Sequence, residues 1–284
     1  MEQASALFPV PSDVRRESVL AGGVPAEWVE APGADPARVI LYFHGGGYAL
    51  GSLKTHRSLV AALSRQARSR VLSLGYRLAP EHPFPAAVED ACAAYGWLLE
   101  QGVGSRRVFL AGDSAGGGLT ISALLAIRDA GTPLPAAGLC LCPWVDLLGT
   151  GRSLLRNASK DPMIEPEGLK LLGRLYLGEG KAVHPWADPL GTDLSGLPPL
   201  LIQAGTNEAL LDDATRLADR ARDFGVRVSL RRWKDMFHVW HFFAPILPEG
   251  KMALEEIGRF VERHAASPRR RSTRNSPSME MALG

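Results

Sequence analysis

From about residue 36 onward, short apolar runs alternate with longer segments in which apolar residues recur every three or four positions. The short runs have the length of buried strands, and the longer segments have the spacing of helices with one buried face. The predicted strands cover residues 39–43, 70–74, 107–110, 137–142, 200–204 and 226–233. The predicted helices cover residues 54–68, 85–100, 115–128, 210–224 and 251–264. Such alternation predicts an α/β fold with a mostly parallel central sheet flanked by helices.

Two segments depart from this rhythm. Residues 14–20 and 24–30 read as two strands joined by a short turn, which predicts an antiparallel hairpin at the edge of the sheet. Residues 146–190 are irregular and rich in Pro and Gly, with one convincing helix over 165–176. An insertion that follows the carboxyl end of a strand is placed to cover the edge where ligands bind, so we expect a small helical cap there.

The rest of the chain divides simply. We expect one domain over residues 1–265, with a short N-terminal cap segment at 1–13. Residues 266–284 are rich in Ser, Pro and Arg, which predicts a disordered tail. That tail is basic, because its four arginines face one glutamate. Its net charge of +3 in a chain of +2 leaves −1 for the body, so charge gives no reason to expect nucleic-acid binding.

Composition narrows the setting further. The N-terminus has neither the basic nor the apolar region of a signal peptide, and no apolar stretch is long enough to span a membrane, so we expect a cytoplasmic protein. The three cysteines form no disulfide framework and show no metal-ligand spacing. Cys140 and Cys142 lie two apart in a strand-like run, which predicts two small core residues on one face. We expect no metal and no cofactor.

Candidate chemistry centres on Ser114, in the run Gly112–Gly116 with the pattern Gly-x-Ser-x-Gly. A strand-like run precedes it and a helix-like run follows, which is the setting of a nucleophile elbow: a sharp turn that lifts a serine hydroxyl above a sheet. The pattern alone is common by chance. The run His44–Gly47, 70 residues upstream and also at a strand end, strengthens it because it supplies oxyanion-hole amides in lipases and esterases.

A serine needs a base, and the base needs an acid to orient it. Of the seven histidines, only His238 and His241 follow the last predicted strand, and His238 is the better candidate. Glu208 lies on the loop after strand 200–204 and is the preferred acid. Asp212 is its main competitor, although Asp212 and Asp213 fall in a first helical turn, where acids usually serve the helix dipole.

Five motifs in order resemble the hormone-sensitive-lipase-like (family IV) α/β-hydrolases, many of which are bacterial carboxylesterases. They are spread over residues 38–264, which is nearly the whole body. The matching stretches are His44–Gly47, Tyr76–Ala86, Gly112–Gly116, Asp161–Ile164 and Met236–Trp240.

The resemblance implies the α/β-hydrolase fold, with Ser114 as nucleophile and His238 as base. It implies an oxyanion hole made by the amides of Gly46, Gly47 and Ala115. Much of the family has Asp-Pro-Leu-x-Asp at the acid, whereas this chain has Glu208-Ala209-Leu210-Leu211-Asp212. Some family members are similar in using Glu.

Several other residues in these motifs are expected to do no chemistry. Tyr76, Arg77, Glu81 and His82 suggest a buried Arg–Glu pair or bonds to the backbone beneath the elbow. Asp161 suggests a turn before its helix, as an N-cap would give. Trp144 and Trp186 border the cap, and the sequence leaves open whether each lines the acyl or alcohol pocket or fills the core.

We therefore expect a serine carboxylesterase that forms an acyl-enzyme with a small-molecule ester. Because few residues precede His44, little is left for an N-terminal cap, which favours an open cleft and short-chain esters. Two alternatives stay open: an amide deacetylase or amidase with the same triad, and a non-catalytic small-molecule receptor. No nucleic-acid partner is expected, and a homodimer is left open.

Overall fold

The computed structural model describes residues 8–178 and 184–265. Eight strands are present in the described residues: β1 (Arg15–Ala21), β2 (Val24–Glu30), β3 (Asp35–Phe43), β4 (Ser69–Leu74), β5 (Val108–Asp113), β6 (Ala137–Leu141), β7 (Leu200–Gly205) and β8 (Val228–Trp233). The α-helices are α2 (Leu53–Ala67), α3 (Ala86–Glu100), α4 (Ala115–Asp129), α5 (Ser153–Arg156), α6 (Pro166–Leu177), α7 (Leu211–Asp223) and α8 (Pro248–His264). Three short 3-10 helices complete the fold: η1 (Ser105–Arg107), η2 (Pro185–Ala187) and η3 (Trp240–Phe243).

All eight strands form one sheet in the order β1-β2-β4-β3-β5-β6-β7-β8. From β4 onward every neighbouring pair is parallel, whereas β2 is antiparallel to both β1 and β4. The edge hairpin and the mostly parallel sheet are therefore confirmed. Because parallel strands end on the same side, the loops after β3, β5, β6, β7 and β8 gather at one edge.

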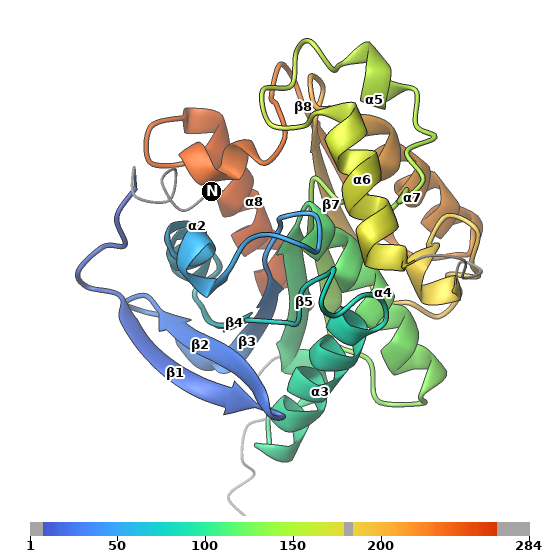
Figure 1. The fold of residues 1–284 in the computed structure, drawn as a ribbon. Coiled ribbons are helices and arrows are strands. Elements are labelled where there is room, and N and C mark those ends of the chain that lie inside the picture. The colour runs from blue at the N-terminus through green and yellow to red at the C-terminus, as the bar shows by residue number, and fades with distance from the viewer. Residues whose placement is uncertain (1–7, 179–183, 266–284) are drawn as a thin grey trace, which may run out of the picture.

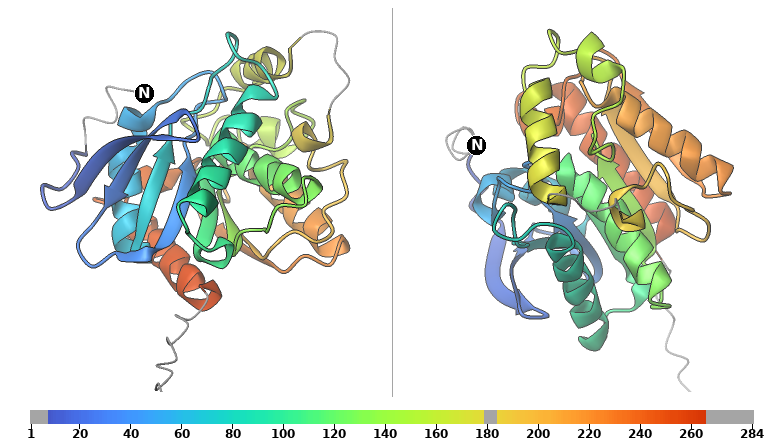
Figure 2. Two further views of the ribbon diagram at one scale, coloured as in Figure 1. Left: turned by 90° about the horizontal axis from the view of Figure 1, so that it is seen from below. Right: turned by 45° about the vertical axis from the view of Figure 1, so that its right-hand side comes forward.

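Helices cover both faces of the sheet. Figures 1 and 2 show α2 and α8 side by side on one face and α3, α4 and α7 on the other. Successive residues of a strand feed these two layers in turn, as the pleat requires. Leu41 belongs to the layer with α3 and α4, while Ile40 and Tyr42 pack with α2 and α8. All six residues of β5 are buried, so the strand that carries Ser114 lies in the middle of the core.

The irregular segment lies between β6 and β7, as expected. It contains α6 at the expected place and also α5 and η2, which the sequence pattern did not predict. In Figure 1, α5 lies at the top right of the molecule and α6 runs downward from beneath it. Glu165, with Pro166 after it, begins α6: its carboxylate accepts the Glu167 amide at 3.0 Å.

At the ends of the chain the picture is partial. The predicted tail 266–284 lies outside the described residues, as do the first seven residues of the predicted N-terminal segment. Phe8, at the start of the described part, packs edge-on against Phe243 with ring centroids 5.8 Å apart. No helix among the described residues is both long and apolar enough to cross a membrane.

Candidate active site

Ser114 lies in a tight turn between β5 and α4. Its φ of 53° and ψ of −121° are strained for a residue with a side chain, and its amide donates to Leu141 O at 2.9 Å. The turn needs glycine on both sides. A Cβ on Gly112 would lie 2.3 Å from Gly116 O, and one on Gly116 would lie 2.0 Å from Phe43 O. The predicted strand–turn–helix elbow is therefore present.

The loop after β3 carries the next group of candidates. Gly46 and Gly47 have φ values of 121° and 63°, and a Cβ on Gly46 would lie 2.2 Å from Leu50 O. No hydrogen bond within the described residues uses the amide of Gly46 or Gly47. The Ala115 amide opens α4, where helix geometry provides no acceptor. Three free donors thus occur at the loop and the elbow, as an oxyanion hole requires.

A buried carboxylate ties this loop to the elbow. Asp113, directly before Ser114, accepts hydrogen bonds from the Tyr42 hydroxyl at 2.6 Å and the Gly45 amide at 2.9 Å through Oδ1. Its other oxygen lies 3.4 Å from His56 Nε2, and His56 Nδ1 lies 2.8 Å from the Thr55 hydroxyl. Through the Gly45 amide, Asp113 thus holds the loop after β3 against the turn that carries Ser114. The sequence analysis singled out neither Asp113 nor His56.

The charge state of this network follows from its contacts. Burial alone would raise the pKa of Asp113, but the charge and hydrogen bond of His56 and the Tyr42 hydroxyl outweigh it and lower the pKa to about 2. His44 stacks on the Tyr76 ring with centroids 4.4 Å apart. Burial and the charge of His56 lower the pKa of His44 to about 4, so His44 is neutral near pH 7.

The predicted base and acid meet at the edge next to β7 and β8. His238 Nδ1–H donates to Glu208 Oε2 at 3.3 Å, and both side chains are buried. The loop after β7 holds Glu208. The side-chain amide of Asn157, in the insertion, donates from Nδ2 to the Glu208 carbonyl oxygen at 2.9 Å. The Val239 amide donates to Cys142 Sγ at 3.3 Å, while the Trp144 amide donates to Ser114 O at 2.9 Å. The loop after β6 therefore links the histidine to the serine.

Burial and mutual charge shift the pKa values of Glu208 and His238. Burial raises the pKa of Glu208 despite the hydrogen bond from His238. Burial on its own would lower the pKa of His238, but the hydrogen bond and charge of Glu208 outweigh it, so the pKa of His238 is raised. His238 Nε2 is buried and has no hydrogen-bond partner among the described residues. This is the nitrogen that would face a proton donor.

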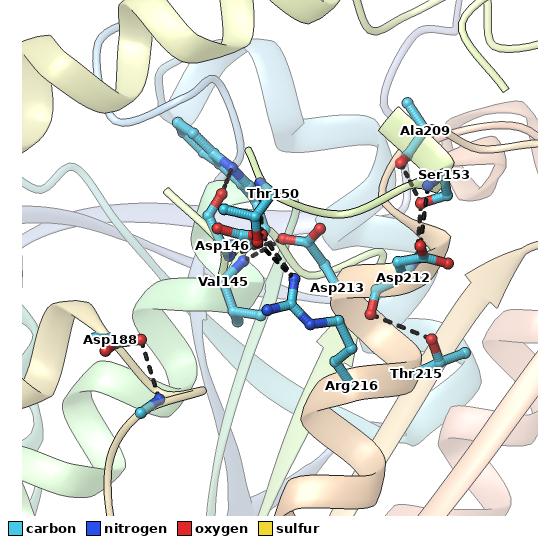
Figure 3. Close-up of polar contacts among 12 residues, drawn as sticks. Val145, Asp146, Thr150, Ser153, Asp188, Ala209, Asp212, Asp213, Thr215 and Arg216 are labelled. Atoms are coloured by element: carbon cyan, nitrogen blue, oxygen red, sulfur yellow. Dashed lines mark hydrogen bonds and ion pairs between the residues drawn. The ribbon is translucent and has the colours of Figure 1, made fainter. Parts of the chain in front are cut away.

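The competing candidates are engaged elsewhere. His241 is buried with Nε2 2.9 Å from Gln203 Oε1, and burial lowers its pKa to about 3. Asp212 lies in the first turn of α7, where Oδ2 accepts the Ser153 amide at 3.0 Å and Oδ1 pairs with Arg156. Figure 3 shows Asp212 beside Ser153, at the junction of the insertion and α7. Among the described residues, neither His241 nor Asp212 forms a hydrogen bond or ion pair with Glu208 or His238.

Asp213 has a different role from its neighbour. Its buried Oδ2 accepts the amides of Val145 and Asp146 at 3.0 and 2.8 Å, and Figure 3 shows it pointing at that loop. Asp146 in turn pairs with Arg216 at 2.7 Å. Burial raises the pKa of Asp213 to about 7, although both amides oppose the shift. Asp213 thus connects the start of α7 to the loop that follows Cys142.

The prediction that Cys140 and Cys142 share a face is wrong. Cys140 packs in the layer of α3 and α4, and Cys142 in the layer of α2 and α8. The strand ends at Leu141, and Cys142 adopts a φ of 48°, which breaks the alternation of the strand. Among the described residues, Cys142, Glu208 and His238 also form the one group with metal-ligand spacing, their ligand atoms lying within 4.8 Å of one another.

The insertion contacts the loop after β3 directly. A Cβ on Gly47 would lie 2.5 Å from Leu172 Cδ1, so α6 covers this glycine. Tyr176 of α6 stacks on Tyr48 with ring centroids 3.7 Å apart. Trp144 is buried in the core, with its ring centroid 5.9 Å from that of Tyr48. The Trp186 indole instead donates to Asp129 Oδ2 at 2.8 Å at the surface. Trp144 therefore fills core at the base of the insertion.

Two of the accessory predictions need correction. The predicted pair of Arg77 with Glu81 is absent: Arg77 pairs with Asp90 and Glu89, at 2.8 and 3.0 Å, and Glu81 is exposed. The alternative of a bond to the backbone holds for Tyr76, whose hydroxyl donates to His44 O at 2.7 Å.

Asp161 is not a helix N-cap, because α6 begins five residues later at Pro166. Its Oδ1 does hold a turn by accepting the Met163 amide at 2.9 Å. Its Oδ2 accepts the Ala209 amide at 2.7 Å and so supports the loop of Glu208.

Comparison with known proteins agrees with this geometry. Residues 40–242 match a family with the alpha/beta hydrolase fold. The chain is 50% identical over 251 residues to an acetyl-hydrolase of Streptomyces hygroscopicus, covering 88% of this chain and 82% of that protein. It is 33% identical over 262 residues to an esterase of Acinetobacter venetianus, covering 92% and 86%. A crystal structure of an esterase from the bacterial hormone-sensitive lipase family superposes with a TM-score of 0.91 at 51% identity, covering 93% and 89%.

Proposed function

This chain belongs to the hormone-sensitive-lipase-like family of α/β-hydrolases and is a carboxylic ester hydrolase, and on that premise we propose a serine mechanism acting on short-chain esters. Ser114 is the nucleophile, His238 the general base and Glu208 the acid that orients it. The observation that carries the proposal is the buried hydrogen bond from His238 Nδ1 to Glu208 Oε2 at 3.3 Å. It leaves the other ring nitrogen of His238 as the acceptor for a serine proton.

The mechanism follows from these positions. Ser114 Oγ attacks the ester carbonyl carbon while its proton moves to His238 Nε2. The resulting oxyanion accepts hydrogen bonds from the amides of Gly46, Gly47 and Ala115, and one such donor is worth about 10²–10³ in rate. His238 then gives the proton to the leaving alcohol as the carbon–oxygen bond breaks. Water attacks the acyl-enzyme by the same route and releases the acid.

The name of one relative supports a short acyl group. The Streptomyces relative is named for the acetyl group. The cavity bounded by Tyr48, Gly118, Trp144 and Tyr176 measures about 10 Å³, which suits about one water molecule and offers no room for an acyl chain. We expect kcat/KM to peak at acetyl to hexanoyl esters and to fall at ten carbons or more.

Two experiments test the proposal. Ser114→Ala should abolish hydrolysis of p-nitrophenyl acetate with the folded protein intact, and a fluorophosphonate should label Ser114 alone. Ser18→Ala, at an exposed serine of β1, is the matched control. Labelling of another serine would refute the nucleophile. A series of p-nitrophenyl esters tests the acyl limit, and a steady rise to palmitate would contradict it.

A second candidate keeps the same site but changes the bond. The name acetyl-hydrolase specifies the acyl group and leaves the bond open, so an acetylated amide is the alternative substrate. Comparing p-nitrophenyl acetate with p-nitroacetanilide separates the two. The receptor alternative has no support, because the serine, acid and histidine are all present and the relatives are hydrolases.

A further inference from the structure

Three buried polar residues recur at every fourth position in the insertion: Ser153, Asn157 and Asp161. Helix α5 begins at Ser153, and the turns after it keep the helical spacing. The Asn157 amide donates to Ser153 O, and the Asp161 amide donates to Asn157 O, each at 2.9 Å. Residues four apart on such turns share one face, so these three residues form a polar stripe that faces one way. Buried polar groups need partners, and the partners of this stripe show what it holds.

Asn157 holds the residue that bears the acid. Its Nδ2 donates to Glu208 O at 2.9 Å and to Thr206 O at 3.2 Å. The side-chain amide has two N–H groups, so one is available for each carbonyl oxygen. These two bonds fix the main chain from which the Glu208 side chain extends to His238.

Ser153 and Asp161 hold the main chain that follows Glu208. The Ser153 hydroxyl donates to Ala209 O at 2.7 Å and accepts the Asp212 amide at 2.9 Å, as Figure 3 shows. Asp161 Oδ2 accepts the Ala209 amide at 2.7 Å. The polar stripe thus binds the loop after β7 on both sides of the Glu208 side chain.

The Glu208 side chain depends on this support because few bonds hold it directly. Within the described part of the chain its carboxylate accepts the 3.3 Å bond from His238 through Oε2, and Oε1 has no partner. We propose that the polar stripe positions the acid, with Asn157 as the main positioning residue, so that the insertion sets the contact between Glu208 and His238. The proposal rests on the proposed role of Glu208 as the acid. The insertion then has a task in the chemistry besides covering the edge of the sheet.

Loss of a positioning contact has a distinctive kinetic consequence. Asn157 acts on the main chain of Glu208, so its removal should lower kcat and leave KM unchanged. Burial alone would lower the pKa of His238, and the hydrogen bond and charge of Glu208 outweigh it. A longer contact weakens this contribution, so the acid limb of kcat/KM against pH should move downward.

Other charged groups near His238 stay in place when Asn157 is changed. Asp161 of the insertion and Asp113 at the end of β5 both raise the pKa of His238. His241 is neutral near pH 7, since burial lowers its pKa to about 3. Because Asn157 itself is uncharged, a shift of the acid limb in its variant reports on the position of Glu208.

The first experiment compares Asn157→Ala with Trp186→Phe, using p-nitrophenyl acetate. Trp186→Phe is the matched control, because it removes a hydrogen bond between the insertion and Asp129, away from the loop of Glu208. Asn157→Ala should lower kcat about 10- to 100-fold, as displacement of a catalytic group does, and should move the acid limb down by about half a pH unit. Trp186→Phe should change neither. If Asn157→Ala lowers stability but keeps the wild-type kcat per folded molecule, the stripe is structural and the proposal fails.

A double variant shows whether Asn157 acts through Glu208. In Glu208→Gln, Asn157→Ala should have little further effect on kcat, because the group that it positions no longer carries a charge. An equal fold-loss in the wild-type and Glu208→Gln backgrounds would overturn the proposal. If Glu208→Gln alone keeps full activity, the proposed acid fails instead, which distinguishes the two hypotheses.

Ser153→Ala covers the case in which Asn157→Ala does not fold. It removes only the hydroxyl, and the bond from the Ser153 amide to Asp212 Oδ2 at 3.0 Å can remain. kcat should fall about three- to tenfold, as loss of a hydrogen bond of this kind does, and the acid limb should again move downward. An alanine variant with the kcat and pH profile of the wild type rejects the proposal.

Discussion

The end of β5 and the loop after β7 each place a buried carboxylate beside a buried histidine, yet the two pairs differ in how completely the carboxylate is bonded. Asp113 uses both oxygens, which receive the Tyr42 hydroxyl, the Gly45 amide and His56. Within the described part of the chain, Glu208 receives one hydrogen bond of 3.3 Å through Oε2, and Oε1 has none. The pKa of Asp113 falls to about 2, whereas burial raises the pKa of Glu208.

This difference matches the two tasks. A carboxylate with several donors is fixed in charge and position, which suits a group that holds the loop after β3 against the turn at Ser114. A carboxylate with few donors binds the imidazolium more strongly as that charge forms, which suits the acid of a triad. Asp213 is a third buried carboxylate, with two amide donors and a pKa raised to about 7.

The largest effect is expected at Glu208. Glu208→Gln keeps the shape of the side chain but loses its charge, so kcat for p-nitrophenyl acetate should fall by about 10⁴, as such changes do in triads. Asp212→Asn is the control, because Asp212 bonds Ser153 and Arg156 and not His238. The reverse ranking would move the acid to Asp212.

At Asp113 we expect a substitution to lower the free energy of unfolding. Asp113→Asn places an amide group where three donors converge and leaves His56 without its partner, which should cost about 3–5 kcal/mol in the free energy of unfolding. Urea unfolding measures this, with Asp219→Asn at an exposed helix position as the control. A loss no greater than in the control would show that the network carries little of the stability.

Asp213, the third buried carboxylate, tests the effect of burial on stability through pH. Its pKa is higher in the folded protein than the ordinary 3.8, so its protonated form favours folding. That contribution is complete below pH 3.8 and is lost as the pH rises to about 7, at about 1.4 kcal/mol for each unit of the shift. Both amides bond Oδ2, so Asn can replace Asp without losing them. Asp213→Asn should gain stability over wild type as the pH rises from 4 to 7. A constant difference between the two would contradict the raised pKa.

The smallest effect is a shift in the pH dependence of kcat/KM. Because Glu208 raises the pKa of His238, the acid limb of kcat/KM in the wild-type protein should have its midpoint above 6.5, the ordinary value for histidine. Activity should fall as the pH drops through that midpoint, since a protonated His238 cannot accept the serine proton. In Glu208→Gln the midpoint of the residual activity should move downward. A midpoint below 6.5 in the wild type would show that burial outweighs the carboxylate.

The order of the strands and of the helices that flank the sheet, and the places of Ser114, Glu208 and His238 along the chain, followed from the sequence, whereas α5 and η2 did not. Apolar periodicity shows which segments form strands and helices, because burial of one face is a local property of the chain. The glycines around Ser114 report a turn that no other residue can make, and the motif order places a histidine after the last strand. The family resemblance added the three amides, and all of these groups lie at one edge of the sheet.

Only the tertiary structure decided how the buried polar groups are matched. The pattern of alternate residues placed Cys140 and Cys142 on one face, but a single positive φ after Leu141 turned Cys142 toward the acid. His56 is 57 residues from Asp113 along the chain and Asn157 is 51 residues from Glu208, so no periodicity connects them. Periodicity shows which side of an element is buried. Hydrogen-bond partners depend on distances between elements, which exist only once the sheet has brought them together.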